Sequence, residues 1–461
     1  MKTLDQIAAE LQAYDPQALS ADAVGAFLSR LVEPVLESET VGIFEALGRV
    51  LAVDVVSPLN VPPHDNSAMD GYAFDGGQLA AGQALCLKVV GTALAGKAWR
   101  GAAGAGECVK IMTGAVMPAG LDTVVPQELV SVSTGADAGA TQTITIPPQR
   151  IQPGDNRRHL GEDIRKGQVA LAQGARLSPA ALGLLASLGI GQVTVWRRLR
   201  VAYFSTGDEI LSLGQAPREG AVYDSNRYTV YGLLTRLGAQ MIDLGVVPDE
   251  PVALEAAFRQ AAGQADAIIT SGGVSVGEAD HTKAMMKKLC ADSGGVAFWR
   301  IAMRPGRPMA VGRISANFGM KTGDSPRGTS IVSYQRDSNK DSKQSAILFG
   351  LPGNPVAVMV TFLAFVRPAL LQMMGSTEAA LPLLQARSVD AIRKRPGRTE
   401  YQRGIVSLGR DGVLQVRITG NQGSGVLSSM TQASGLIVLR HDQDSVAAGD
   451  SVDVMMFDGV I

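Results

Sequence analysis

The stretch Ala265-Asp266-Ala267-Ile268-Ile269-Thr270-Ser271-Gly272-Gly273-Val274-Ser275-Val276-Gly277-Glu278-Ala279-Asp280 decides how this chain folds. Its first half is a short apolar run, which predicts a buried strand of a parallel sheet. Two glycines follow at once, and because they lack Cβ atoms they let backbone N–H groups face an anion. Glu278 and Asp280 come close enough to hold a hard cation beside that anion. The stretch therefore predicts a site for a phosphorylated ligand with magnesium. The alternative is an ordinary strand-to-helix turn with solvated acids.

Strands and helices alternate on both sides of this stretch, from residue 198 to about residue 380. The predicted strands are 199–204, 241–247, 267–270, 298–301 and 346–349, and the predicted helices are 228–237, 282–289 and two that begin at Pro251 and Pro355. Such alternation predicts a parallel, doubly wound βαβ domain. Ligands on these sheets bind at the carboxyl ends of the strands, where the glycine–carboxylate stretch lies.

The rest of the chain divides around this βαβ domain into a multidomain α/β protein. We expect a discontinuous helical or linker domain at 1–60 and 153–197, with a helix capped by Ser20 and a second helix from Thr40. Glycine turns between short apolar segments predict an inserted β-rich domain at 61–152. The β pattern of 384–461 predicts a small C-terminal β-barrel. Residues 315–345 have no apolar periodicity and are expected to form a solvated excursion.

Composition excludes several classes of protein. At 461 residues the chain is too long for a single core, and its formal net charge of −1 provides no field that would recruit nucleic acid or a membrane surface. Its three cysteines are isolated, which fits a reducing compartment. The N-terminus lacks an apolar signal core, and the longest apolar run, 356–366, is too short to span a bilayer. We therefore expect a cytoplasmic protein without nucleic-acid or membrane partners.

Three acids follow three strands of the predicted sheet. Glu209 ends the stretch Ser205-Thr206-Gly207-Asp208-Glu209, Asp249 follows the next strand, and Asp280 follows the glycines. Helix capping is the plain alternative for Asp249. Because strand ends of one parallel sheet meet at one edge, we expect the three carboxylates to converge and handle a metal.

Anion-binding candidates lie in two later segments. Arg300, Arg304 and Arg307 occur in a proline-stiffened stretch, and their guanidinium groups suit tetrahedral oxyanions; a solvated edge is the alternative. The turn Gly350-Leu351-Pro352-Gly353-Asn354-Pro355 leads into a helix whose N-terminus favours an anion. A P-loop-like stretch at 91–97 is rejected, because Ala98 replaces the hydroxyl that binds the metal and no helix is expected to follow. No Gly-x-Gly-x-x-Gly opens a helix, which disfavours a dinucleotide oxidoreductase.

Several of these segments together resemble the molybdopterin molybdenumtransferases, the molybdenum-insertion enzymes of molybdenum cofactor biosynthesis to which the gephyrin E domain is related. The matching stretches are 62–73 (Pro-Pro-His-Asp-Asn-Ser-Ala-Met-Asp-Gly-Tyr-Ala), 111–115, 158–164, 205–209, 271–280, 350–355, 403–404 and 420–424. They cover nearly the whole chain in the expected order. Lysine is common in the family where Arg300, Arg304 and Arg307 stand, so the charge is kept while the fork geometry differs.

The resemblance implies an elongated homodimer with composite active sites, which inserts molybdenum from molybdate into adenylylated molybdopterin, uses Mg²⁺ and releases AMP. By position, Asp70, Thr113 and Asp163 would form a wall contributed by the partner subunit. Glu209, Asp249 and Asp280 would be the catalytic and metal-handling acids. The substrate-binding residues would be Ser271, Gly272, Gly273, Ser275, Arg300, Arg304, Arg307, Pro352, Pro355, Arg403 and Ser424. A molybdopterin adenylyltransferase and cofactor-delivery proteins are candidate partners.

Two other functions share parts of this pattern. Molybdopterin adenylyltransferases use the same type of βαβ domain, although the four-domain layout argues against that function. Gephyrin also serves as a receptor scaffold without catalysis. That role requires additional partner-binding regions, for which only the 315–345 excursion is a candidate here.

Overall fold

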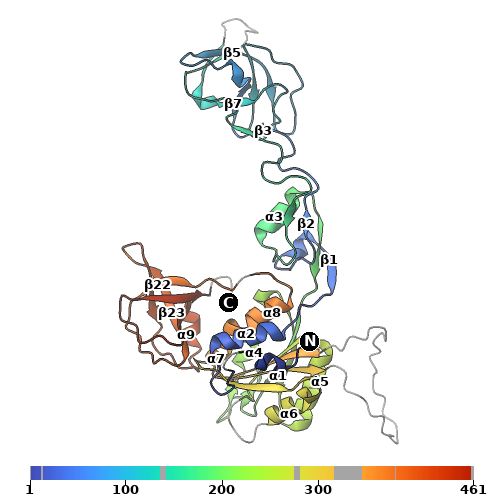
Figure 1. Cartoon of the computed structure of the whole chain (residues 1–461), viewed down its shortest axis with the longest axis vertical. Coiled ribbons are helices and arrows are strands. Elements are labelled where there is room, and N and C mark those ends of the chain that lie inside the picture. Colours follow the sequence, from blue (N-terminus) through green and yellow to red (C-terminus); the bar gives the residue numbers. More distant parts are fainter. Residues whose placement is uncertain are drawn as a thin grey trace, which may run out of the picture.

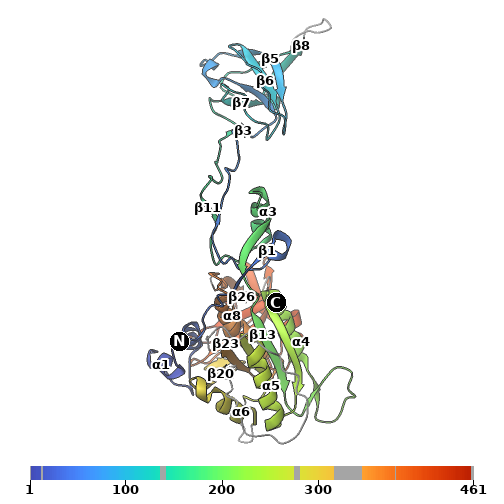
Figure 2. The same ribbon diagram turned by 90° about the vertical axis from the view of Figure 1, so that its right-hand side faces the viewer.

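The computed structural model describes residues 2–11, 14–134, 142–274, 281–315, 345–378 and 380–457. The chain is elongated, with an α/β body beside a small barrel at one end and a separate β-rich unit at the other (Figures 1 and 2). A slender region containing β1 (Ser38–Gly42), β2 (Val55–Val56) and α3 (Pro179–Ser187) lies between these two ends. The predicted multidomain α/β fold class is confirmed.

The α/β body is built on a six-stranded sheet in the order β16-β13-β17-β21-β20-β18. The strands are β16 (Gln240–Val247), β13 (Arg200–Thr206), β17 (Ala267–Ser271), β21 (Ser345–Leu351), β20 (Pro308–Ser315) and β18 (Val296–Arg300). The first four are mutually parallel, as predicted, whereas β20 runs antiparallel to both β21 and β18. The expectation of a wholly parallel sheet is therefore wrong at this edge, because residues 308–315 form a return strand that the sequence pattern did not reveal.

Helices cover both faces of this sheet. Alternate strand residues such as Tyr203 and Ile269 pack in one core with α4 (Ser225–Leu237), whereas Phe204 and Ile268 pack in another with α5 (Pro251–Gln264) and α6 (His281–Cys290). This alternation is the expected result of a strand buried on both faces. Helix α4 begins at Ser225, three residues before the predicted start at residue 228, with Asp224 as N-cap, and it ends at Gly238, whose φ is 90°.

A strongly apolar helical segment runs from Pro355 to Met373 and has a mean hydropathy of 1.8. It comprises α7 (Pro355–Thr361), a π-helical turn (Phe362–Val366) and α8 (Arg367–Met373). It is longer than the apolar run noted in the sequence and is long and apolar enough to cross a membrane. However, 83% of its most apolar window is buried inside the protein, which is the environment of a core helix.

The slender region differs from its predicted structure. Residues 38–42 form β1, which pairs antiparallel with β12 (Gln192–Trp196), and only a short 3-10 turn (Ile43–Ala46) follows. The predicted helix from Thr40 is therefore wrong. Helix α2 (Ala21–Leu31), with Ser20 as N-cap, is confirmed.

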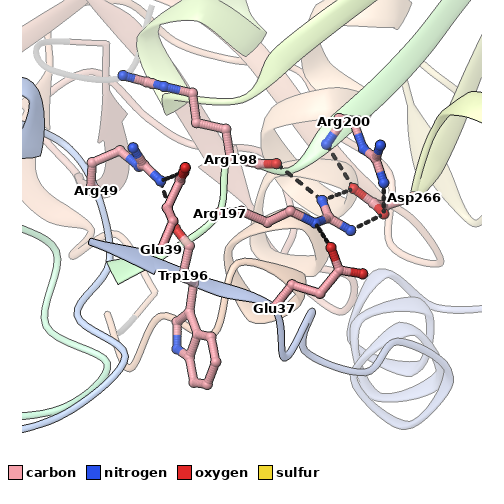
Figure 3. A network of polar contacts seen from close by, with 8 residues as sticks. All are labelled: Glu37, Glu39, Arg49, Trp196, Arg197, Arg198, Arg200 and Asp266. Carbon is pink, nitrogen blue, oxygen red and sulfur yellow. Dashed lines mark hydrogen bonds and ion pairs between the residues drawn. The ribbon is translucent and has the colours of Figure 1, made fainter. Parts of the chain in front are cut away.

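A polar network fixes the slender region to the sheet of the α/β body (Figure 3). Arg197, directly after β12, donates from Nη1 and Nη2 to the two carboxylate oxygens of Asp266 at 2.7 Å each, and from Nε to Glu37 at 2.7 Å. Asp266 precedes β17 and also accepts the backbone N–H of Arg200 at 2.8 Å. A bidentate pair of this kind fixes direction as well as contact, so it orients the connection that carries the β-rich unit.

The two remaining units are built mainly of β-strands, with one short helix, α9 (Ser428–Gln432), in the C-terminal unit. In the β-rich unit a six-stranded sheet has the order β7-β4-β6-β5-β9-β8. Its strands are β4 (Gly71–Phe74), β5 (Leu85–Ala93), β6 (Glu107–Ile111), β7 (Thr123–Pro126), β8 (Ser131–Thr134) and β9 (Gln142–Ile146). The C-terminal strands are β22 (Leu384–Ser388), β23 (Thr399–Leu408), β24 (Leu414–Ile418), β25 (Gly435–Leu439) and β26 (Ser451–Met456), and a β23–β25 pairing closes them into the predicted barrel.

Candidate active site

A pocket of about 1070 Å³ opens at the carboxyl ends of the parallel strands and reaches the loop at 422–425 of the barrel. Its volume suits a substrate larger than a simple ion. The predicted site residues that line it are Glu209, Ser271, Gly272, Gly273, Arg304, Arg307, Pro352, Pro355 and Ser424. Residues from separate segments of the sequence therefore converge here, as the strand order predicts.

The glycine turn after β17 forms part of the pocket wall, and no larger residue fits at either of its two glycine positions. Gly272 and Gly273 have φ values of 93° and 65°. A Cβ on Gly272 would lie 2.6 Å from the carbonyl oxygen of Thr206, and one on Gly273 would lie 2.4 Å from Cβ of Thr282. The turn therefore needs glycine at both positions and presents backbone to the pocket. Ser275 lies outside the described residues.

Beneath this turn, three hydroxyl groups bond to one another. The Tyr203 hydroxyl lies 2.7 Å from Oγ of Ser271 and 2.8 Å from Oγ of Ser205, and the two serine oxygens are 3.1 Å apart. Burial raises the pKa of Tyr203, so its phenol stays protonated at neutral pH. The cluster fixes the end of β17 against β13 and thus sets the position of the glycine turn.

The structure separates the predicted acids. Glu209 is exposed and lines the pocket, whereas Asp249 is half-buried and accepts a hydrogen bond from Oγ1 of Thr282 at 3.2 Å outside the pocket lining. Because Thr282 also packs against Gly273, Asp249 lies behind the glycine turn. Asp280 is outside the described residues, and those residues contain no group of three or more His, Cys, Asp or Glu side chains that could hold a metal.

The three predicted arginines also fall in different places. Arg304 and Arg307 line the pocket, and the short strand β19 (Met303–Arg304) pairs with β23 and so attaches this segment to the barrel. Arg300 is exposed at the end of the edge strand β18, and its backbone N–H donates to the carbonyl of Pro16 at 2.8 Å. Arg300 does not line the pocket, but Arg398 does, and sequence reasoning did not find it.

Arg403 acts on the pocket indirectly. Its side chain is buried and donates to Oγ of Ser429 at 2.9 Å and to the carbonyls of Asn421 and Gly423 at 3.2 and 2.9 Å. Burial lowers its pKa, and the charge of Arg304 adds to this effect. Arg403 therefore holds the loop that presents Ser424, and the Ser424 carbonyl in turn accepts the N–H of Val356 at 3.1 Å.

The residues predicted for the cross-subunit wall lie in the β-rich unit and the connection to it. Asp70 accepts the N–H and the hydroxyl of Thr113 on the same oxygen, Oδ1, at 2.7 Å each. The Thr113 N–H, and then its hydroxyl, hold the pKa of Asp70 below its usual range. Asp163 is exposed, with its N–H bonded to the Val61 carbonyl at 3.0 Å. The β-rich unit stands far from the α/β body of the same chain (Figures 1 and 2).

Sequence reasoning missed a group of polar residues beside α4. Asp224 and Asn226 are buried and line the pocket together with Thr206, which ends β13. The available signal was the run Val222-Tyr223-Asp224-Ser225-Asn226, a short β segment followed by a helix N-cap pattern.

Comparison with known proteins identifies the relatives of this chain. Residues 19–189 match the MoeA N-terminal region (domain I and II), residues 202–372 a probable molybdopterin binding domain, and residues 385–457 the MoeA C-terminal region (domain IV). A molybdopterin molybdenumtransferase of Haemophilus influenzae is 38% identical over 92% of this chain and 95% of its own length. One from a Nostoc species is 34% identical over 91% and 88%.

Solved structures agree with these sequence matches. A molybdopterin biosynthesis moeA protein of Pyrococcus horikoshii aligns with a TM-score of 0.67 at 27% identity, over 96% of this chain and 99% of the other. A second structure of that description aligns with a TM-score of 0.73 at 24% identity and shares the fold, over 95% and 100%. This chain belongs to the molybdopterin molybdenumtransferase family.

Proposed function

We propose that the pocket at the strand ends is where this enzyme inserts molybdenum from molybdate into adenylylated molybdopterin and releases AMP. Membership of the family makes the chain an enzyme of molybdenum insertion in cofactor biosynthesis. The observation that carries the assignment to this pocket is the convergence of a backbone glycine turn, a carboxylate and guanidinium groups in one cavity. These groups suit an anionic, phosphorylated substrate and an incoming oxyanion.

Magnesium is part of this proposal. Mg²⁺ usually takes one or two protein carboxylates together with substrate phosphates and waters, so it does not need a preformed group of three side chains. Glu209 in the pocket fits that pattern. Asp249 and Asp280 are the other proposed ligands, and Asp249 would have to leave its hydrogen bond with Thr282 to reach the ion. When bound, the ion would neutralise charge on the phosphate oxygens.

Each active site is proposed to be completed by a second copy of the chain. Asp70 has one carboxylate oxygen occupied by Thr113, which leaves Oδ2 free of that pairing. The β-rich unit that contains Asp70 lies at the opposite end of the molecule from the α/β body and the barrel (Figure 1), whose residues line the pocket of the same chain. In a homodimer whose β-rich unit reaches the partner's pocket, Asp70, Thr113 and Asp163 would form a wall of that pocket.

The division of the chain follows the same proposal. We assign 1–60 and 153–197 to the linker domain, 61–152 to the inserted domain, 198–380 to the molybdopterin-binding domain and 384–461 to the barrel. Separate hydrophobic clusters in the β-rich unit, the slender region and the barrel support this division, except that the helical segment before residue 38, including Phe27 and Leu28, packs in the core of the α/β body. We place the enzyme in the cytoplasm, where adenylyltransferase and cofactor-delivery partners would meet it.

Two incubations, one with the substrates of insertion and one with molybdopterin and ATP, distinguish the three candidate functions. The protein is mixed with adenylylated molybdopterin, molybdate and Mg²⁺, and AMP release and active cofactor are measured together. Insertion predicts that both appear and that both require molybdate. An adenylyltransferase would instead form adenylylated molybdopterin from molybdopterin and ATP, and a scaffold would do neither.

Replacing one pocket arginine should affect molybdate selectively. Arg304→Ala removes a guanidinium that lines the pocket, and a hydrogen bond to a charged group contributes about 1.5–3 kcal/mol. We expect the molybdate concentration for half-maximal turnover to rise about 10- to 100-fold, with a smaller change for the pterin substrate. Arg300→Ala, outside the pocket lining, is the matched comparison. A loss confined to pterin binding would instead place Arg304 on the substrate phosphates.

A further inference from the structure

Three buried oxygen atoms beside the pocket have no hydrogen-bond partner in the part of the chain that the structure describes. They are Oγ1 of Thr206, Oδ2 of Asp224 and Oδ1 of Asn226. Their residues are 4%, 4% and 8% exposed, and all three residues line the pocket. A buried acceptor without a partner costs about 1–3 kcal/mol, more for a charged group, so each such group calls for an explanation.

The other polar atoms of two of these residues are already engaged. Oδ1 of Asp224 accepts the backbone N–H of Arg227 at 3.1 Å and thereby caps α4. Nδ2 of Asn226 donates to the carbonyl of Gly353 at 2.7 Å. These bonds fix both side chains, and in each case the remaining unbonded atom is an acceptor.

The three acceptors belong to one part of the pocket. Asp224 and Asn226 lie in the same turn at the start of α4. Asn226 is hydrogen-bonded to Gly353. Gly353 lies beside Gly272, because a Cβ added to Gly353 would be 3.9 Å from Cα of Gly272. Gly272 in turn lies against the carbonyl of Thr206, which a Cβ added to Gly272 would meet. The contacts thus run continuously from Asn226 through the two turns to Thr206.

The cationic part of the pocket is built by different segments. Arg304 and Arg307 belong to the segment that pairs with barrel strand β23, and Arg398 directly precedes that strand. The pocket is therefore lined by guanidinium-bearing residues on the barrel side and, on the α4 side, by residues whose unbonded acceptor oxygens lie just inside the wall. A substrate with an anionic end and a donor-rich end is matched by such a pocket in one orientation.

We propose that Thr206, Asp224 and Asn226 form the subsite that binds the pterin ring, through its N3–H and 2-amino group; this inference rests on the proposed function. A 2-amino-4-oxo-pyrimidine ring presents these donors side by side, and neighbouring donors match a set of acceptors. The donor edge would supply the hydrogen bonds that Oδ2 of Asp224 and Oδ1 of Asn226 lack. The phosphate groups would then lie toward the arginines.

The alternatives fit these acceptors less well. In adenine the exocyclic amino group lies between two ring-nitrogen acceptors, which would face the same oxygens without a hydrogen bond. Magnesium takes carboxylates, substrate phosphates and several waters in a near-octahedral shell, whereas only one of the three oxygens here belongs to a carboxylate. Both alternatives are outcomes of the experiment below.

Asp224→Asn tests the subsite with little change of shape. The amide oxygen of the new asparagine can still accept the Arg227 N–H. Its NH₂ group, a donor, would then point toward the donor groups of the pterin ring. We expect the affinity for 6-hydroxymethylpterin to fall about 10- to 100-fold and the KM for adenylylated molybdopterin to rise by a similar factor. AMP affinity and the magnesium requirement should stay within about twofold. Glu219→Gln, an exposed carboxylate in the connection before α4, is the matched control and should change none of these values.

If the Asp224→Asn protein is unstable, a second variant and a second ligand still test the subsite. Thr206→Val removes an unbonded hydroxyl and should weaken pterin binding about 2- to 10-fold. A lumazine with the same 6-substituent carries oxygen in place of the 2-amino group. Wild-type protein should prefer the pterin, and either variant should reduce that preference.

Two results would overturn the subsite. One is an unchanged pterin preference together with a raised magnesium requirement, which would indicate a cation site. The other is a loss of AMP affinity alone, which would place adenine there. Failure of the proposed function is distinguishable, because wild-type protein would then neither bind adenylylated molybdopterin nor release AMP from it.

Discussion

Asp70→Asn is expected to lower molybdenum insertion at least about 100-fold, although the residue lies in a unit remote from its own chain's pocket. Both donors from Thr113 bond to Oδ1, and an asparagine oxygen can accept both. The substitution therefore preserves the local structure and removes only the charge. Loss of one preorganised polar group from an active site typically costs about 10²- to 10³-fold in rate.

The measurement is AMP release from adenylylated molybdopterin with molybdate in excess. Glu128→Gln, which neutralises another exposed acid of the β-rich unit, should keep wild-type turnover. Binding of the pterin substrate to the Asp70→Asn protein should weaken far less than turnover. Equal turnover of the two variants would exclude Asp70 from the active site.

Asp266→Ala should lower the free energy of unfolding of the α/β body by about 3–5 kcal/mol, because it leaves a charge without its buried partner. The Asp266 side chain is 7% exposed and that of Arg197 is 16% exposed (Figure 3). The Asp266 carboxylate joins β17, β13 and the slender region.

Chemical denaturation followed by the buried Trp299, which belongs to the α/β body, measures this effect. The comparison is Glu37→Gln, the third member of the network, whose side chain is 66% exposed. Exposed pairs contribute about 0–1 kcal/mol, so this variant should remain close to wild type. Similar losses for the two variants would show that burial is not what makes the Arg197–Asp266 pair strong.

Local signals in the sequence predicted the elements whose ends they define. Ser20 caps α2, Pro251 begins α5 and Gly238 ends α4 in the left-handed conformation that glycine favours. The apolar runs of β13 and β17 were sufficient because each strand is buried on both faces. The converging glycine turn and Glu209 followed from strand order alone.

Elements that depend on distant partners were not predicted. Strand β1 exists through its pairing with β12, about 150 residues later in the chain, and its own residues at 38–42 also suit a helix start. The return strand β20 directly follows the arginine–proline segment, whose turn residues gave no strand pattern, and it is recognised only by its pairing with β18 and β21. For the same reason the three arginines were predicted to form one cluster, whereas the turn between β18 and β20 directs only Arg304 and Arg307 to the pocket.

The sequence also could not predict which buried side-chain atoms lack a hydrogen-bond partner. One oxygen of Asp224 caps α4, a helix whose predicted start lay later, at residue 228. Only the structure reveals that its second oxygen is buried without a partner beside the pocket.

Mixing two inactive variants tests most directly the claim that each active site combines two chains. Asp70→Asn subunits, with an altered β-rich unit, are combined with Arg304→Ala subunits, with an altered pocket, and the mixed dimer is purified with two affinity tags. In that dimer one composite site carries both substitutions and the other carries neither. At molybdate concentrations where each parent is nearly inactive, we expect the mixed dimer to recover about half the wild-type turnover. Turnover no higher than that of the parents, in a verified mixed dimer, would contradict that claim.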